Sequence, residues 1–378
     1  MKLFHLSDLH FGKRVNEFSM IDDQRYIIDK MLELADEHKP DGIILAGDIY
    51  DKSVPTTEAV ELFDNMLTRL AARNIPTYII SGNHDSAERL DFASELIELS
   101  GIHISAVYRG EVPFAETEDE FGKIRIYMLP FIKPVHVKRY FPDAEINSYT
   151  DAVRTAVEAA SIDTSVRNIL VTHQFVTGAS RTESEDISVG GTDNVDASVF
   201  EGFDYVALGH IHRSQPAGGE HIRYSGTPLK YSFSESKDTK SVAIVELKEK
   251  GNIEYKFIPL VPKRDMLEIK GTYNEIISKD FRENLDMEDY YRITLTDEDD
   301  IPDAAAKLRV VYKNLMRLDY DNTRTRSFAV ITNDSDPENT DPLTLFSDLY
   351  VKQYGREMND DQRLAVEELI TKLWEGER

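Results

Sequence analysis

Seven side chains that can bind a metal ion follow short apolar runs of this sequence. They comprise two carboxylates, one amide and four imidazoles, namely Asp8, His10, Asp48, Asn83, His173, His210 and His212. The set is too large for one ion and matches two divalent ions about 3.5–4 Å apart, an arrangement that suits displacement at phosphorus. The residues therefore predict a metal-dependent hydrolase.

Local spacing favours the convergence of these ligands. One residue separates the members of each of two pairs, so extended backbone would project both side chains of a pair from one face; the pairs are Asp8-x-His10 and His210-x-His212. Gly47 precedes Asp48, and its missing side chain lets the backbone turn sharply and bring the carboxylate to the site. A carboxylate with two oxygens can bridge two ions, whereas an imidazole cannot.

His84 follows Asn83 directly and need not bind metal itself. An imidazole at this position can stabilise the transition state or protonate the leaving alkoxide. We expect Asp85 to orient the ring of His84 as its carboxylate partner. His84 and Asp85 are therefore the predicted catalytic residues.

Strand-like segments precede all of these motifs. The carboxyl ends of strands in an open α/β sheet form the binding crevice, which is where the motifs would lie. Helical spacing of apolar residues predicts helices over Met20–His38 and Thr57–Arg73, and the later part of the region predicts a second sheet. The expected strands are Lys2–Leu6, Gly42–Ala46, Thr77–Ser81, Asn168–Val171 and Tyr205–Leu208.

The chain divides into three predicted parts. A layered α/β domain covers 1–262, and the proline-containing segment Pro259–Arg264 serves as the linker. A small α+β domain covers 263–335, with strands Met266–Lys270, Tyr290–Leu295 and Met316–Tyr320 and helices Asn274–Arg282 and Pro302–Leu315. After the polar tract Thr332–Asp341, two helices are expected within 341–378.

The apolar stripe of the last predicted helix requires a packing partner. Its residues are Val366, Leu369, Ile370, Leu373 and Trp374. Two interpretations stay open, docking of the stripe against its own chain and binding of a partner protein.

Composition narrows the possible functions. The 378 residues include no cysteine, so a metal must be held by nitrogen and oxygen ligands. The net charge of −25 argues against a uniformly basic nucleic-acid-binding surface, so bound cations would supply the local positive field. We found no apolar run of the roughly 20 residues that a membrane helix needs and no signal region, so no membrane contact and a cytoplasmic location are expected. There is also no phosphate-binding loop, so any ATP would be hydrolysed by another polypeptide.

The ordered motifs of residues 1 to about 235 resemble the calcineurin-like metallophosphoesterase superfamily, which implies an α/β/β/α sandwich. Within it, four segments resemble the SbcD nuclease subunits of bacterial SbcCD DNA-repair complexes: Phe4–His10, Ala46–Asp51, Gly209–Arg213 and Tyr224–Glu235. The small α+β domain and the helical tail extend the likeness across nearly the whole chain.

This resemblance implies a DNA nuclease with two manganese ions, magnesium or another divalent ion being possible. Asp48 would bridge, with Asp8, His10 and His212 completing one set and Asn83, His173 and His210 the other. His84 matches the catalytic histidine. The resemblance further implies double-strand exonuclease and single-strand or hairpin endonuclease activity. It also implies a homodimer within a heterotetramer, a capping domain that binds DNA, and C-terminal helices that dock on an SbcC-type ATPase.

Asp51 departs from the archaeal and eukaryotic relatives, which carry histidine there.

Two other functions compete with the nuclease. A phosphatase or small-molecule phosphodiesterase would use the same core, but the protein phosphatases' Asp-Arg-Gly motif is replaced by Asp51-Lys52-Ser53. A catalytically silent scaffold would have no chemical reason to keep all seven ligands and His84.

Basic residues offer three candidate DNA contacts. The preferred one is Lys133–Arg139, with four potentially cationic side chains. The others are Lys13-Arg14 and a predicted helical group of Lys307, Arg309, Lys313 and Arg317. Four further residues are weaker candidates near the site and are expected to have surface or supporting roles: Asp51, Arg181, Arg213 and Tyr231.

Overall fold

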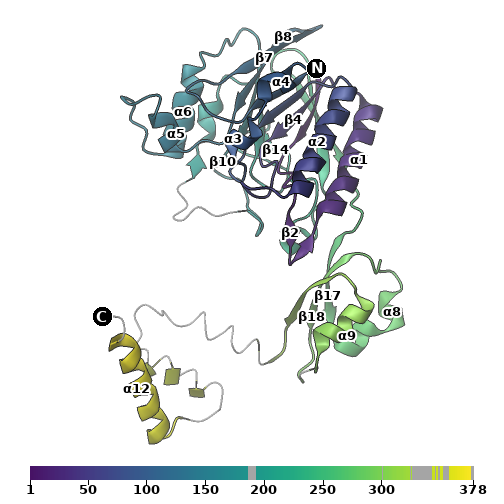
Figure 1. Ribbon diagram of the computed structural model, residues 1–378, viewed down its shortest axis with the longest axis vertical. Helices are drawn as coiled ribbons and strands as arrows, with labels where there is room; N and C mark the ends of the chain where they lie inside the picture. The colour runs from purple at the N-terminus through teal and green to yellow at the C-terminus, as the bar shows by residue number, and fades with distance from the viewer. Residues whose placement is uncertain are drawn as a thin grey trace. The chain divides into compact units, whose positions relative to one another are not determined.

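The computed structural model describes residues 1–185, 193–299, 301–323, 325, 343–344, 346–347, 350–351 and 357–375. The chain forms two compact units, Met1–Leu267 and Glu268–Arg378 (Figure 1). All seven predicted ligands belong to the first unit. The functions predicted for the separate domains stay predictions.

The first unit contains a six-stranded sheet with the order β16-β15-β1-β4-β5-β6. Four of its strands are parallel neighbours: β1 (Lys2–Leu6), β4 (Gly42–Ala46), β5 (Thr77–Ile80) and β6 (Ile102–Ser105). Antiparallel β15 (Ser241–Leu247) and β16 (Ile253–Pro259) extend the sheet beyond β1. The carboxyl ends of β1, β4 and β5 therefore meet at one edge.

A second six-stranded sheet has the order β13-β14-β12-β9-β8-β7. Its parallel strands are β8 (Gly122–Leu129), β9 (Arg167–His173), β12 (Tyr205–Gly209) and β14 (Ile222–Tyr224). Antiparallel β7 (Phe114–Asp119) and β13 (Gln215–Pro216) lie at its two edges. The predicted second sheet is thus confirmed.

Apolar side chains alternate between the two faces of the second sheet. Ile169 and Val171 of β9 face the first sheet and pack with Ile44 and Ile80. Leu170, between them, joins the core beneath the outer helices. This period of two is expected of a strand buried on both faces, and it fixes the register that delivers His173 to the strand end.

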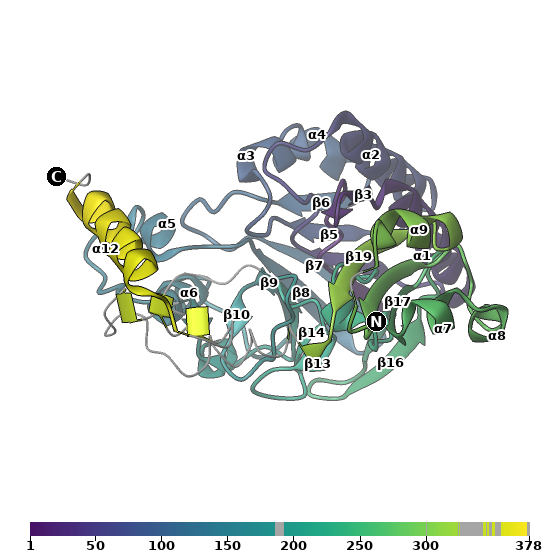
Figure 2. The same ribbon diagram turned by 90° about the horizontal axis from the view of Figure 1, so that it is seen from below.

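Helices cover both outer faces of this pair of sheets. Figure 1 shows α1 (Ile21–His38) and α2 (Thr57–Ala72) on one side, with α5 (Pro134–Lys138) and α6 (Tyr149–Ala159) on the other, and Figure 2 shows the same layers from below. Thr56 caps α2 through its side chain, and Ser148 with Asp151 forms a capping box on α6. The layered α/β/β/α sandwich predicted from the sequence is confirmed.

Shorter elements connect these layers. The helical ones are α3 (Ala87–Leu90), α4 (Ser94–Glu98), η1 (Ala197–Phe200) and η2 (Phe233–Glu235). The strands form two small pairs, β2 (Arg14–Val15) with β3 (Phe18–Ser19), and β10 (Phe175–Val176) with β11 (Asn194–Val195).

A further three-stranded sheet has the order β17-β18-β19, and β18 and β19 belong to the second unit. Its strands are β17 (Met266–Gly271), which begins at the end of the first unit, β18 (Tyr290–Leu295) and β19 (Leu315–Tyr320). The single helix predicted over Asn274–Arg282 is wrong, because extended Ser278 ends α7 (Tyr273–Ile277) and caps α8 (Lys279–Arg282). The helix predicted to reach Leu315 ends at Val311, as α9 (Ala304–Val311), and Leu315 already pairs in β19.

The described part of the tail includes α12 (Asp360–Glu375), where the last helix was predicted. Leu369 of its predicted stripe is 60% exposed. The side chains of Leu373 and Trp374 lie outside the described residues, as does the tract Thr332–Asp341. Among the described residues, no helix has the length and hydropathy needed to cross a membrane.

Candidate metal centre

The structure brings all seven predicted ligands together where strands of both sheets end. From the first sheet, Asp8 and His10 follow β1, Asp48 follows β4 and Asn83 follows β5. From the second sheet, β9 ends at His173, and β12 leads directly into His210 and His212. Parallel strands deliver their carboxyl ends to the same edge, which is why ligands so distant in sequence can meet.

Main-chain geometry in these loops differs from the extended conformation that the sequence predicted. Asp8, His10 and Asp48 have φ of 55°, 45° and 50°, and His210 has φ of 99°. Two backbone hydrogen bonds join the loop after β1 to the loop after β4. Asp8 N–H donates to the Gly47 carbonyl oxygen at 3.0 Å, and His10 N–H donates to the Asp48 carbonyl oxygen at 2.9 Å. The left-handed backbone conformation of these four residues, rather than strand alternation, therefore sets the direction of their side chains. Such conformations concentrate at functional sites.

Two glycines make room for the convergence. Gly47 has φ of 85°, and a Cβ there would overlap the Nδ1 atom of His173. At Gly82 a Cβ would overlap the Asp48 carboxylate. The sharp turn predicted at Gly47 is present, and the close approach of neighbouring loops adds a second reason for glycine.

The ligand atoms form three overlapping groups, each with its members within 4.8 Å of one another: Asp8, His10 and His212; His10, Asp48 and His84; Asp8, Asp48 and His173. Asn83 joins them through its Oδ1 atom, 3.0 Å from His173 Nε2 and 2.8 Å from His210 Nδ1. Except for His84 and Asn83, these residues are buried. The cluster thus gathers anions, an amide oxygen and imidazoles away from bulk water.

Burial sets the charge states of this cluster. It lowers the pKa of His10 and of His210 well below the usual value, which leaves both rings neutral with lone pairs available. Burial also raises the pKa of Asp8 to about 6. Burial opposes ionisation of Asp48 as well, but the surrounding imidazoles, His173 foremost, hold its pKa well below the usual value. Burial lowers the pKa of His173, yet the Asp48 carboxylate outweighs this and raises it to about 9.

The donor set fits a divalent cation. His10 Nε2 and His212 Nε2 face each other at 3.1 Å, and two neutral rings cannot both place a lone pair there without a shared cation or proton. Buried His10 Nδ1 and His210 Nε2 have no hydrogen-bond partner among the described residues. Converging nitrogen and oxygen lone pairs of this kind suit first-row divalent metals.

His84 is oriented by a main-chain oxygen. Its Nδ1 lies 3.0 Å from the Asp51 carbonyl oxygen, which can only accept, so Nδ1 carries a proton. Its Nε2 lies 3.9 Å from Asp48 Oδ2. The predicted pairing of Asp85 with this ring is wrong, because the Asp85 carboxylate accepts bonds from the backbone N–H groups of three other residues, Ile49, Tyr50 and Gly82. Asp85 therefore supports the ligand loops rather than the ring.

Sequence reasoning missed a polar network behind His212. Ser184 Oγ lies 2.6 Å from His212 Nδ1 and 2.6 Å from a Glu235 oxygen. Buried Lys240 donates to the His212 carbonyl oxygen at 2.8 Å and to Glu235 at 2.5 Å. Burial disfavours the Glu235 anion, but these contacts with His212 and Lys240 lower its pKa to about 2. The segment Tyr224–Glu235 carried the only sequence signal for this network, and Lys240 gave none.

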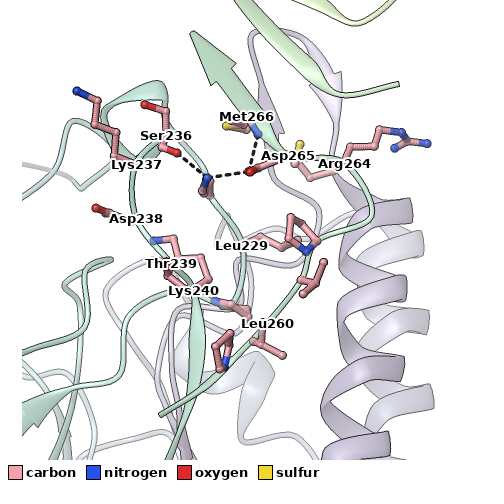
Figure 3. Close-up of a pocket in the computed structure, with 16 residues that line it drawn as sticks. Leu229, Ser236, Lys237, Asp238, Thr239, Lys240, Leu260, Arg264, Asp265 and Met266 are labelled. Atoms are coloured by element: carbon pink, nitrogen blue, oxygen red, sulfur yellow. Dashed lines mark hydrogen bonds and ion pairs between the residues drawn. The ribbon is translucent and has the colours of Figure 1, made fainter. Parts of the chain in front are cut away.

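A cavity of about 340 Å³ lies against the segment that carries Lys240 (Figure 3). Its walls include Leu229, Leu260 and Met266. Lys230 is bonded there to Asp265 at 2.7 Å and to the Ser236 carbonyl oxygen at 2.6 Å. The charge of Lys230 is thus matched within the cavity wall, as that of Lys240 is matched by Glu235.

The four residues predicted to have surface or supporting roles near the site all contact other protein groups. Buried Tyr231 donates to the Leu9 carbonyl oxygen at 2.6 Å, and Arg213 pairs with Asp238 at 3.0 Å. Arg181 pairs with Asp193 at 2.8 Å. The Asp51 carboxylate binds Lys13 Nζ at 2.7 Å, so this cation is already engaged.

The other basic groups remain at the surface. Lys133, Lys138 and Arg139 are exposed around α5. The predicted helical group is corrected in part, because Lys307 and Arg309 lie on α9, whereas Arg317 lies on β19 and pairs with Asp319 at 3.0 Å. Lys313 follows the end of α9 and lies 3.7 Å from Glu288.

Comparison with known proteins agrees with this geometry. Residues 1–214 match the calcineurin-like phosphoesterase family, and residues 262–354 match the type 5 capsule protein repressor C-terminal domain, SbcD_C. The SbcD subunit of the SbcCD nuclease of Staphylococcus epidermidis is 30% identical over 100% of both chains. The chain belongs to the SbcD family. The Staphylococcus saprophyticus member of this family carries the same name and is 32% identical over 99% of both chains.

A solved structure, TT1561 of Thermus thermophilus, covers 68% of this chain and 98% of its own at 12% identity, with a TM-score of 0.41. That score is too low to add to the assignment. Membership in the SbcD family, taken with the buried Asp and His cluster, indicates a metallophosphoesterase with a divalent metal site.

Proposed function

We propose that this protein is a manganese-dependent DNA nuclease that acts as a double-strand exonuclease and a single-strand or hairpin endonuclease. An SbcC-type partner would supply ATP hydrolysis. One observation carries the proposal: two carboxylates, an amide and four imidazoles converge in a chain of the SbcD family. Phosphodiester hydrolysis is the chemistry that such a donor set serves.

Two ions would share Asp48. Its Oδ2 lies 3.7 Å from His10 Nε2 and 3.3 Å from His173 Nε2, between the two groups of imidazoles. Asp8, His10 and His212 would complete one set, and Asn83, His173 and His210 the other. This many nitrogen ligands favours manganese over magnesium, which prefers oxygen. Bound metal would activate a water and neutralise the phosphoryl oxygens.

His84 would serve the leaving group. The bond to the Asp51 carbonyl oxygen fixes the ring and leaves Nε2 directed toward the cluster, and the side chain keeps 19% exposure. As hydroxide oxygen bonds to phosphorus and the ester P–O bond breaks, the leaving alkoxide needs a proton. A protonated His84 can donate it from Nε2 and later regain one from water.

The assembly would be a homodimer within a heterotetramer. Three large apolar side chains around α3 and α4 are 81%, 71% and 87% exposed, namely Phe92, Leu96 and Leu99. A second copy of this chain would cover them, since isolated patches of this kind mark interaction sites.

The remaining contacts would come from the second unit. Leu364 and Leu369 of α12, 57% and 60% exposed, would dock on the ATPase. The exposed Lys307 and Arg309 of α9 would contact DNA.

The test is manganese-dependent cleavage of a labelled hairpin-ended duplex by the full chain, with and without the ATPase partner. We expect His84→Gln to lower cleavage about 10²- to 10⁴-fold while manganese affinity measured by calorimetry stays within about twofold. A monoester phosphatase assay runs in parallel. Monoester turnover without DNA cleavage, even with the ATPase added, would overturn the nuclease assignment.

A further inference from the structure

Two phenylalanine rings border the histidine cluster. The Phe131 centroid lies 6.3 Å from that of His173, and the Phe175 centroid lies 6.3 Å from that of His210. The two histidine rings are themselves 5.2 Å apart. Both phenylalanines are partly exposed, so apolar ring surface reaches solvent beside a site otherwise built from polar groups.

The backbone holds both rings at the strand ends that carry the ligands. Phe131 closely follows β8, and its N–H donates to the Ser81 carbonyl oxygen at 3.0 Å. Phe175 begins β10, two residues after His173. The positions of these rings are therefore fixed by the same elements that fix the ligands, as a substrate-positioning group requires.

A cationic side chain lies over each of the two phenylalanine rings. The Arg181 guanidinium carbon lies 3.7 Å from the Phe175 centroid, and Lys133 Nζ lies 5.9 Å from the Phe131 centroid. Arg181 is paired with Asp193, and its Nε is buried with no hydrogen-bond partner within the described part of the chain. Lys133 is exposed at the N-cap of α5. Positive charge thus remains available beside Phe131, whereas the charge of Arg181 is matched by Asp193.

The two phenylalanine rings differ in whether a ring face is open to a ligand. Arg181 already covers a face of Phe175, which also packs against the core beneath α6. Among the described residues, the cation over Phe131 is the flexible Lys133 at the longer distance of 5.9 Å, and the His173 ring meets Phe131 edge-on. Phe131 is therefore the ring with a face that a ligand can occupy, and Phe175 braces Arg181.

We propose that Phe131 stacks an unpaired base next to the scissile phosphate, while Lys133 binds a flanking phosphate. This inference depends on the proposed nuclease function and assigns the residue that would position the unpaired nucleotides of hairpin loops and frayed ends. A base inside a duplex has both faces covered by its neighbours, whereas an unpaired base offers one to an aromatic ring. The stacking contact therefore selects for unpaired nucleotides without reading their sequence.

The experiment compares Phe131→Leu with the wild type on two hairpin substrates, using the full chain with manganese and the ATPase partner. One substrate has normal loop nucleotides, and the other carries abasic residues at both positions flanking the cleaved bond. We expect Phe131→Leu to lower kcat/KM about tenfold on the normal loop and less than about twofold on the abasic loop. Phe131→Tyr, which keeps the ring, should restore cleavage of the normal loop.

A control is Phe114→Leu, which removes an exposed ring beside a cation, the Arg125 guanidinium carbon being 4.9 Å from the ring centroid. Phe114 lies on edge strand β7 and should not affect either substrate. Equal losses on normal and abasic loops in Phe131→Leu would overturn the stacking role and assign the ring to support of His173. Wild-type protein that cuts neither loop would instead refute the nuclease function itself.

Discussion

The two sheets contribute different ligands to the metal centre and hold them in different ways. The first sheet supplies all the oxygen ligands, on loops joined by main-chain bonds between Asp8 and Gly47 and between His10 and Asp48. The second sheet supplies only imidazoles. His212 is held by side chains, with Ser184 Oγ against its Nδ1 and Lys240 Nζ on its carbonyl oxygen, whereas the Ala46 carbonyl oxygen lies against Nδ1 of His173.

This difference indicates where the site is vulnerable. Main-chain hydrogen bonds survive most side-chain substitutions, so the first-sheet loops should fail mainly when a ligand, a glycine or the supporting Asp85 carboxylate is changed. Imidazoles oriented by side chains should be sensitive to changes in residues that never touch the metal, as is usual for the outer contacts of metal ligands.

The largest effect is expected for Asp48→Asn. This change removes the anion that lies between both groups of imidazoles, and with it the charge that a shared pair of ions requires. We expect manganese affinity and DNA cleavage each to fall by about 10³-fold or more. Calorimetric titration and cleavage rates check this. A variant that still binds two ions tightly would show that the first sheet does not supply the bridge.

Gly82→Ala tests the packing of the first-sheet loops. The added methyl would overlap Asp48 Oδ1 and displace the carboxylate, so manganese affinity should fall about 100-fold. The matched control is Gly271→Ala, where the nearest atom is the flexible end of Glu275 at 3.3 Å. Unchanged metal titration in Gly82→Ala would mean that the loop can move without cost.

Lys240→Met tests the side-chain support of the second sheet. It breaks the bond to the His212 carbonyl oxygen and leaves the buried Glu235 anion without its cation. We expect the free energy of unfolding to fall by about 3 kcal/mol and manganese affinity by about tenfold. Chemical denaturation and calorimetry measure the two effects.

Lys230→Met is the control for that change, since Lys230 lines the same cavity but pairs with Asp265, whose side chain is 39% exposed (Figure 3). It should cost about 1 kcal/mol or less and leave metal binding unchanged. Equal losses in both variants would show that the cavity wall, rather than the contact with His212, supports the site.

The smallest effect on the metal centre is expected at the other end of β9, where Arg167 binds Asp119 at 3.1 Å. Burial opposes the Asp119 anion, but its bonds with Arg167 outweigh this and lower its pKa. An Asp with a depressed folded pKa contributes stability that is complete above its unfolded pKa of about 4 and is lost as pH falls toward the folded value.

Asp119→Asn should therefore lower the free energy of unfolding by about 2 kcal/mol at pH 7, with a smaller difference from the wild type at pH 3. Metal affinity at pH 7 should not change, because the pair lies away from the ligand end of the strand. Denaturant titrations at the two pH values provide the measurement. A difference that grows toward acid would contradict the stabilising role of the ionised carboxylate.

Much of the framework followed from local patterns. The strands ending near Leu6, Ala46 and His173 were predictable because buried parallel strands appear as short apolar runs. Errors arose where a neighbour changes the local preference. Ser278 lies inside a helical pattern but caps a second helix, and Leu315 continues an apolar helix pattern but is recruited by β18.

The sequence by itself determined the chemical types at the centre: oxygen and nitrogen ligands without thiolates, each placed after an apolar strand. Composition and short-range periodicity are properties of the chain alone. The tertiary structure decided which groups meet, including the main-chain oxygen of Asp51 on His84, the three backbone bonds of Asp85 and the contact of Lys240 with His212. Such partners depend on how distant loops approach in the folded protein, and spacing along one strand does not encode that approach.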